Sequence, residues 1–242
     1  METAAIEEMF RLEDHHWWFV GKRLLLDALL AADGPPPGGR ILDVGCGTGA
    51  VLAGLGGRGR PVGVDRSADS LAFCRRRGLL ALARADASRL PFRPATFDTV
   101  LLLDSLEHVE DELALLAEVR RLLTPAGRLL VSVPAFAFLW SAHDEVLHHL
   151  RRYTAPGLRA VLERSGLAVR RLTYTNLFAF PPALAVRGLL PLLGVRRREG
   201  TDFRTHARST NALLLAAYRV EAALLRRLRL PVGLSVAAVA TR

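Results

Sequence analysis

The sequence predicts a doubly wound α/β fold, in which helices cover both faces of a mainly parallel sheet. Short apolar runs typical of buried strands alternate along the chain with stretches of helical periodicity. The strand-like run Arg40–Val44 leads directly into a loop with glycine at every second position, Gly45–Gly49. Such a loop is typical of a buried strand that turns sharply into a helix. Its glycines let backbone N–H groups come close to a ligand.

The other elements follow from the same two periodicities. Strands are predicted at Arg40–Val44, Val62–Val64, Leu80–Arg84, Thr99–Leu103, Arg128–Val133, Val169–Tyr174 and Leu234–Thr241. Helices are predicted at Ile6–Asp14, Lys22–Ala32, Ser67–Arg77, Glu112–Leu123, Ala155–Ser165 and Ala212–Arg229. In such a sheet the ligand crevice lies outside the carboxyl ends of the strands, and the glycine loop belongs there.

A chain of 242 residues, half of them apolar, is long enough to form one domain with a full core. We expect a helical cap at residues 1–33 and a cofactor-binding core at residues 38–134, with a proline- and glycine-rich hinge between them. Residues 135–153 and 177–230 exceed the minimal fold. They are expected to build the substrate side, because loops on a rigid scaffold carry specificity.

Arginine carries almost all of the net charge of +9, and Lys22 is the only lysine. We interpret the arginine clusters as solvated helix faces. The sequence lacks a basic stretch interleaved with aromatic residues, which argues against nucleic acid as a partner. The chain starts with an acidic, amphipathic stretch in place of a secretory signal, and its cysteines, Cys46 and Cys74, lie on different elements. Both features favour a cytoplasmic protein with free thiols.

The segment Leu177–Val195 is apolar enough to resemble a membrane span, with Arg187 as its only charge. Pro181 and Pro182 interrupt it, so we predict broken helices that line an apolar pocket or an interface. The alternative is contact with a lipid surface or a prenyl-like substrate. The apolar residues of this segment and of 212–225 also offer a surface for a second copy of the chain, as a homodimer.

Two cofactor classes fit the glycine loop. The stretch Gly45–Ala50 satisfies a variant of the dinucleotide fingerprint. Asp43, however, would repel a pyrophosphate at the helix N-terminus, and it would attract the ammonium or sulfonium of S-adenosylmethionine. Asp65 ends the next strand about 20 residues on, where a carboxylate can bind both ribose hydroxyls. The residues therefore favour S-adenosylmethionine over a nicotinamide dinucleotide.

With these features the chain resembles the class I S-adenosylmethionine-dependent methyltransferases, in particular the bacterial type 11 and type 23 methyltransferase-domain group. The stretches that resemble the family's motifs, in their order along the chain, are residues 41–49, 62–65, 84–92, 97–109 and 122–131. The flanks at residues 15–19 and 140–153 also resemble this subgroup. The resemblance implies a Rossmann-like sheet of seven strands whose last strand is antiparallel.

The resemblance also implies a set of cofactor-binding residues. Asp65 accepts hydrogen bonds from the ribose, and Arg66 stacks on the adenine. Asp86 accepts a hydrogen bond from the adenine amino group, while the Ala87 N–H faces a ring nitrogen. The backbone of Asp104 borders the methionine moiety. The remaining members are the loop glycines and the carboxylate before them, Gly45, Gly47, Gly49 and Asp43.

Methyl transfer from a sulfonium is an in-line displacement, for which a protein supplies alignment, desolvation and in some cases a base. His108, after the fourth strand, and His143, beside Asp144 in the expected substrate lid, are candidate bases. The alternative for His108 is a role as a helix cap or in packing. No metal is predicted, although Glu107 stands beside His108, because the sequence does not cluster a full ligand set.

The N-terminal aromatic stretch His16–Phe19 is predicted to fold over the site. In that arrangement Trp17 closes the pocket and Arg23 meets the carboxylate of the cofactor. The alternative is an aromatic staple that only docks the cap on the sheet.

The predicted function is transfer of a methyl group from S-adenosylmethionine to a small-molecule or lipid-like acceptor, with histidine-assisted deprotonation. Oxygen is the first expectation for the acceptor atom, with nitrogen and carbon as alternatives. The stretch Asp104–Glu107 replaces an Asn/Asp-Pro-Pro-Tyr motif, which argues against amino methylation of nucleobases. Three other hypotheses stay open: an RNA methyltransferase, a nicotinamide-dependent oxidoreductase and a non-catalytic module that binds S-adenosylmethionine.

Overall fold

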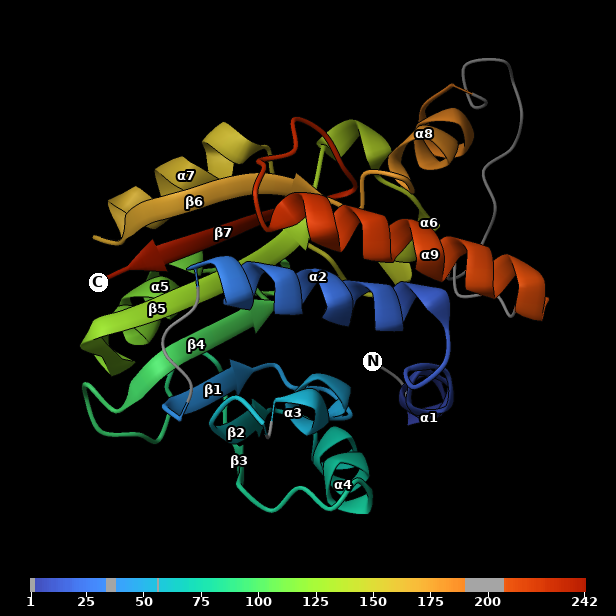
Figure 1. Cartoon of the computed structure of the whole chain (residues 1–242). Coiled ribbons are helices and arrows are strands. Elements are labelled where there is room, and N and C mark those ends of the chain that lie inside the picture. The colour runs from blue at the N-terminus through green and yellow to red at the C-terminus, as the bar shows by residue number, and fades with distance from the viewer. Residues whose placement is uncertain (1–2, 34–37, 56, 190–206) are drawn as a thin grey trace.

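The computed structural model describes residues 3–33, 38–55, 57–189 and 207–242. Its sheet has seven strands in the order β3-β2-β1-β4-β5-β7-β6, with helices on both faces (Figure 1). The strands are β1 (Arg40–Val44), β2 (Arg60–Asp65), β3 (Leu82–Arg84), β4 (Phe97–Leu103), β5 (Leu123–Pro134), β6 (Ala168–Thr175) and β7 (Ser235–Thr241). The predicted doubly wound α/β fold is confirmed.

The order of the strands places the expected ligand crevice at the centre of the sheet. β1 runs parallel to β2 on one side and to β4 on the other, so the chain order reverses at the β1–β4 pair. Ligands bind outside the carboxyl ends of the strands at such a reversal. β7 inserts antiparallel between β5 and β6, which confirms the antiparallel last strand.

The helices follow the predicted periodicities, with short additions around the strand ends. They are α1 (Thr3–Leu12), α2 (Trp17–Asp33), α3 (Ala50–Gly54), α4 (Ala68–Arg76), α5 (Glu112–Leu122), α6 (Ala142–Val146), α7 (Ala155–Arg164), α8 (Phe180–Ala183) and α9 (Arg208–Leu225). Two short 3-10 helices are η1 (Leu106–His108) and η2 (Ala137–Leu139), and one π-helical segment is η3 (Leu184–Leu189).

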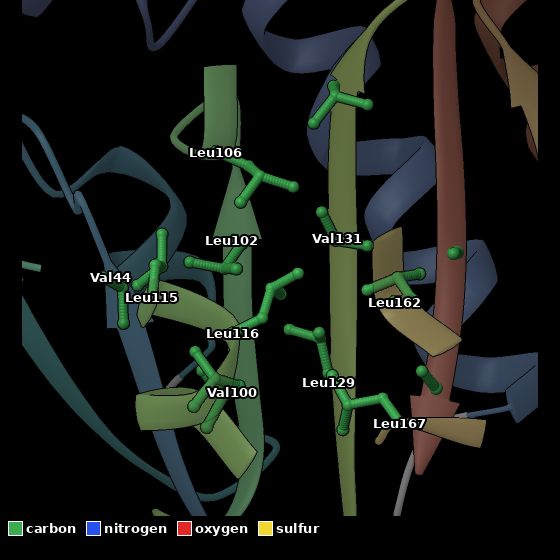
Figure 2. Close-up of a cluster of buried hydrophobic side chains, with 14 of the residues drawn as sticks. Val44, Val100, Leu102, Leu106, Leu115, Leu116, Leu129, Val131, Leu162 and Leu167 are labelled. Carbon is green, nitrogen blue, oxygen red and sulfur yellow. The ribbon is translucent and has the colours of Figure 1, made fainter. Parts of the chain in front are cut away.

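Alternation along the strands divides the core between the two faces of the sheet. On β4, Val100 and Leu102 pack in one cluster with Leu115 and Leu116 of α5 (Figure 2). Leu101, between them, belongs to a second cluster with leucines of α2 on the opposite face. This period of two is the expected consequence of a sheet that is covered on both sides.

The cap helix α2 and the late helix α9 lie side by side on one face of the sheet (Figure 1). Their contact depends on Gly21, because a Cβ at this position would come within 2.4 Å of the Tyr218 ring. Asp33, at the end of α2, accepts a hydrogen bond of 2.8 Å from Arg171 of β6. Helices α2 and α9 therefore form one layer on this face of the sheet.

The apolar segment at residues 177–195 differs from the prediction in one respect. Pro181 and Pro182 occupy the first turn of α8, where a missing N–H removes no helical bond, so they begin the helix and do not break it. The helical path continues into η3, which has the wider π geometry. Residues 190–195, and residues 34–37 of the expected hinge, lie outside the described residues. In the described part of the chain, no helix is both long and apolar enough to span a membrane.

Candidate functional site

The glycine loop joins β1 to α3, and all three of its glycines have left-handed backbone angles. A Cβ on Gly45 would come within 2.5 Å of the Ser105 hydroxyl, and one on Gly49 within 2.6 Å of Leu79. A Cβ on Gly47, which has φ +55°, would meet none of the described atoms within 4 Å. Positions 45 and 49 therefore require glycine, because a Cβ there would clash with Ser105 and Leu79. The space beside Gly47 is open, so a ligand can approach its backbone closely and the loop forms an open cradle.

Two carboxylates flank this cradle. Asp65, at the end of β2, accepts hydrogen bonds from the N–H of Gly47 at 2.9 Å and of Ser67 at 2.8 Å. Asp43, on β1, is buried, and its burial together with the charge of Asp65 raises its pKa to about 7. A cation beside the loop favours the ionised form of Asp43. The open cradle and these carboxylates fit the cationic S-adenosylmethionine.

The predicted adenine-binding residues lie at the same edge of the sheet. Asp65 pairs with Arg84 where β2 meets β3, and Arg84 donates a hydrogen bond of 3.0 Å to the carbonyl of Arg66. Asp86 is exposed and accepts hydrogen bonds from the hydroxyl and N–H of Ser88, which lower its pKa. Ala87 lies between these two residues. The structure thus brings the three predicted cofactor loops together, while their contacts with the cofactor stay predictions.

The cap contacts the glycine loop through Glu13, which follows α1. The Thr48 hydroxyl donates a hydrogen bond to the buried Glu13 carboxylate, and Arg77 forms an ion pair with it at 3.2 Å. Arg23 donates a hydrogen bond of 2.8 Å to the carbonyl of Glu13. The predicted position of Arg23 near the loop fits this network. Its contact with the cofactor stays a prediction.

Trp17 lies between the cap and α9. Its backbone N–H donates a hydrogen bond of 2.8 Å to the side-chain oxygen of Asn211, and its ring centre is 5.8 Å from that of Tyr218. This position matches the staple alternative, and closure of the pocket by Trp17 stays a prediction.

The carboxyl end of β4 adjoins the glycine loop. Asp104 adopts an unusual left-handed conformation with φ +51°, and the ammonium group of Lys22 forms an ion pair with its carboxylate. The next residue, Ser105, donates a hydrogen bond of 2.9 Å to the carbonyl of Val44, directly before the loop. The predicted place of Asp104 beside the cofactor loop is consistent with this geometry.

Beyond Asp104 lies a group of four side chains that we call the histidine cluster: Glu107, His108, Asp144 and His149. Glu107 is completely buried, and burial raises its pKa. The ring centres of His108 and His149 are 4.8 Å apart, and burial together with the neighbouring His149 lowers the pKa of His108 to about 4. His149 donates a hydrogen bond of 2.8 Å to Asp144. The backbone N–H of Leu150 joins the segments by donating to the carbonyl of Glu107 at 2.9 Å.

Asp144 is the centre of this cluster. Its side chain is completely buried, and the side chain of Arg152 is 3% exposed and donates two hydrogen bonds to it, at 2.8 and 2.9 Å. Burial opposes ionisation of Asp144, but the bonds from His149 and Arg152 outweigh it and hold its pKa below the usual range. His143, a predicted base, lies on α6 with its ring centre 6.4 Å from that of His149. The structure therefore pairs Asp144 with His149.

Apolar rings border the cluster. Phe136 follows β5 with φ +59°, and its ring stacks on Tyr174 at 5.1 Å and on Phe138 at 5.2 Å. Arg152 connects the two groups, because it also donates a hydrogen bond of 2.9 Å to the carbonyl of Ala135. Phe138 is 55% exposed, so this aromatic surface is open to an apolar ligand.

Sequence reasoning missed His149 and Lys22 as site residues. His149 follows Asp144 by five residues and lies beyond the end of α6, so the sequence alone does not pair the two side chains. A lone lysine in an arginine-rich chain was a usable signal for Lys22. Its partner Asp104 is 82 residues away, however, so the pairing emerges only from the fold.

Comparison with known proteins gives this geometry its context. Residues 42–131 match a family described as a methyltransferase domain. A demethylmenaquinone methyltransferase from Mycobacterium sp. (strain KMS) is 35% identical over 158 residues, which are 58% of this chain and 68% of that protein. The chain belongs to the S-adenosylmethionine-dependent methyltransferases. This confirms the class I resemblance, and S-adenosylmethionine is the cofactor of the family.

Two further comparisons show how far the sequence and the fold of this chain resemble those of other methyltransferases. A demethylmenaquinone methyltransferase from Beutenbergia cavernae is 41% identical over 113 residues, 46% of this chain and 45% of that protein. An S-adenosylmethionine-dependent methyltransferase from Mesorhizobium loti has the same fold, with a TM-score of 0.59 at 20% identity over 90% of this chain and 98% of that one. The chain spans about half the length of several curated relatives that it matches.

Proposed function

We propose that this methyltransferase transfers a methyl group to an oxygen atom of a small-molecule or lipid-like acceptor. When bound, S-adenosylmethionine supplies a methyl group activated by the sulfonium. The observation that carries the proposal is the placement of two different groups at the β1–β4 reversal. The open cradle at Gly47 lies after β1, and the histidine cluster lies after β4.

The histidine cluster supports an acceptor that must lose a proton. In His149 the Nδ1–H is held by Asp144, so Nε2 is the free acceptor nitrogen. A carboxylate that accepts from one ring nitrogen fixes the tautomer and the orientation of the imidazole. The low pKa of His108 keeps that side chain neutral at pH 7 and makes it a weaker base. His149 therefore joins the predicted His108 and His143 as a candidate base, with its ring oriented by Asp144.

The aromatic surface supports an apolar acceptor. Phe136, Phe138 and Tyr174 stack beside the cluster, and Phe178 nearby in sequence is 45% exposed. Exposed apolar surface of this kind marks ligand or membrane contact. Two of the relatives are named demethylmenaquinone methyltransferases, so demethylmenaquinone in its reduced form, whose two ring oxygens are hydroxyls, is the first acceptor to test.

The test has two stages. Calorimetric titration with S-adenosylhomocysteine, with NADH in parallel, is expected to show one equivalent of the former and no binding of the latter. Transfer of label from methyl-labelled S-adenosylmethionine is then measured with reduced demethylmenaquinone, simple phenols and RNA. Label on an oxygen of an apolar acceptor supports the proposal, and label on a ring carbon would assign the transfer to carbon instead. Binding of NADH alone, or label only on RNA in a salt-sensitive manner, would overturn it.

A further inference from the structure

Three side chains of the histidine cluster point their ligand atoms at one small space. One carboxylate oxygen of Glu107 and one ring nitrogen each of His108 and His149 all lie within 4.8 Å of one another. His149 Nε2 is 4.0 Å from a carboxylate oxygen of Glu107, which is too far for a hydrogen bond. An ion bonded to both at about 2.1 Å spans separations up to about 4.2 Å. The gap has the width of a bound ion.

Glu107 is an unexplained group within this space. Its side chain is completely buried, and within the described residues neither of its carboxylate oxygens has a hydrogen-bond partner. A buried carboxylate without partners is costly and calls for an unseen ligand or ion. Lys22 and Arg152 act on Glu107 through their charges, but the ion pairs they form are with other carboxylates, Lys22 with Asp104 and Arg152 with Asp144.

In both histidines Nδ1 contacts an oxygen acceptor. His149 donates its Nδ1–H to Asp144 at 2.8 Å, and His108 has its Nδ1 3.3 Å from the carbonyl oxygen of His148. Because a carbonyl or a carboxylate accepts and cannot donate, each bond leaves the Nε2 lone pair available. Metal-bound histidines usually donate their other N–H to a carboxylate or a backbone carbonyl in this manner.

We propose that Glu107, His108 and His149 bind one divalent transition-metal ion. Two imidazoles and one carboxylate form the ligand set of catalytic zinc and of non-haem iron(II) sites, which leave positions open for substrate. A tetrahedral ion separates its ligand atoms by about 3.4 Å, so the longest side of the triangle shortens on loading. This revises the expectation that no metal is bound, which rested on the scatter of the ligands along the sequence.

The ion gives the acceptor a binding position, in a step that rests on the proposed function. An acceptor hydroxyl bound at the open position loses its proton to solvent more readily than a free one. His149 then serves as a ligand and not as the base. Asp144 and Arg152 hold the ligand in place from outside the site. A lipid-like acceptor places its apolar part on the neighbouring rings of Phe136 and Phe138.

The first test is metal binding by the whole chain after treatment with a chelator. Zn²⁺ is titrated by calorimetry, and Co²⁺ by the visible absorption that reports its coordination. One equivalent of each is expected. Loss of an outer partner of a ligand costs about 10- to 100-fold in metal affinity, so Glu107→Gln and His149→Ala are each expected to lose more than about 100-fold. His148→Asn is the matched control, because its side chain is exposed and asparagine tolerates its φ of +57°.

The outcomes separate the metal site from the proposed function. Binding of S-adenosylhomocysteine is measured for every variant and is expected to stay unchanged, which shows that the fold and the cradle are intact. Binding of the wild type below one equivalent, or an equal loss in His148→Asn, would overturn the metal site. Full methyl transfer in the presence of the chelator would overturn the role of the ion in binding the acceptor and would leave the proposed function standing. Failure of the wild type to bind S-adenosylhomocysteine would count against the proposed function, and the metal titration would still decide the site.

Discussion

The glycine loop and the histidine cluster stand at the same edge of the sheet but are built by different means. The loop is a local structure, whose three left-handed glycines and anchoring Asp65 lie within 21 residues of one another. The cluster joins η1 to the segment after α6, about 40 residues later, and it is held by buried charges. Substitution of a glycine should therefore damage the glycine loop, and removal of a buried charge should damage the histidine cluster.

The largest effect is expected from Arg152→Ala in the histidine cluster. This change leaves Asp144 buried with its charge only partly compensated. Breaking a buried ion pair from one side costs about 3 to 5 kcal/mol of unfolding free energy. Urea denaturation followed by circular dichroism measures it.

The control for this change is Arg159→Ala. Arg159 pairs with Glu163 at 3.2 Å, but the two side chains are 43% and 52% exposed. Exposed pairs contribute about 0 to 1 kcal/mol, so the midpoint of denaturation should barely move. Equal losses in the two variants would contradict the idea that buried charge holds the cluster.

The second effect concerns the cradle. Gly47→Ala places a methyl group where the ligand comes close, and overpacking of this kind costs about 1 to 3 kcal/mol. The affinity for S-adenosylhomocysteine should fall by about 5- to 150-fold. Gly78→Ala is the matched control, because Gly78 also has a left-handed φ, of +79°, and open space around its Cβ position. A similar loss of affinity in Gly78→Ala would point to a general effect of backbone strain.

This contrast explains what sequence alone could predict. The fold and the loop were predictable because strand periodicity and glycine spacing are local properties of the chain. The close contacts with Ser105 and Leu79, which require glycine at positions 45 and 49, could not be predicted from the sequence. The cluster was only half predicted. His108 and Asp144 were recognised as polar residues after buried strands, but the pairing of Asp144 with His149 depends on how the chain turns after α6.

A third prediction concerns pH and Asp43. The pKa of about 7 lies above the usual 3.8, so the folded state holds a proton that the unfolded state has lost. The contribution of Asp43 to stability therefore falls as pH rises from about 4 to 7. The affinity for a ligand ammonium should instead rise with pH, because this interaction needs the ionised carboxylate of Asp43. From pH 6 to pH 8 the affinity for S-adenosylhomocysteine should rise about tenfold. Calorimetry should show a flat profile over this range for Asp43→Asn.

The smallest effect separates two roles for Arg23. In the structure this side chain supports Glu13, which in turn binds Thr48 of the glycine loop. Loss of one hydrogen bond costs about 0.5 to 1.5 kcal/mol, so Arg23→Ala should weaken the binding of S-adenosylhomocysteine by about 2- to 12-fold. The same loss is expected with methylthioadenosine, which lacks the amino-acid part, because the effect passes through the loop. A loss confined to S-adenosylhomocysteine would instead assign Arg23 to the carboxylate of the cofactor. The cap would then contact the ligand directly, as its sequence predicts.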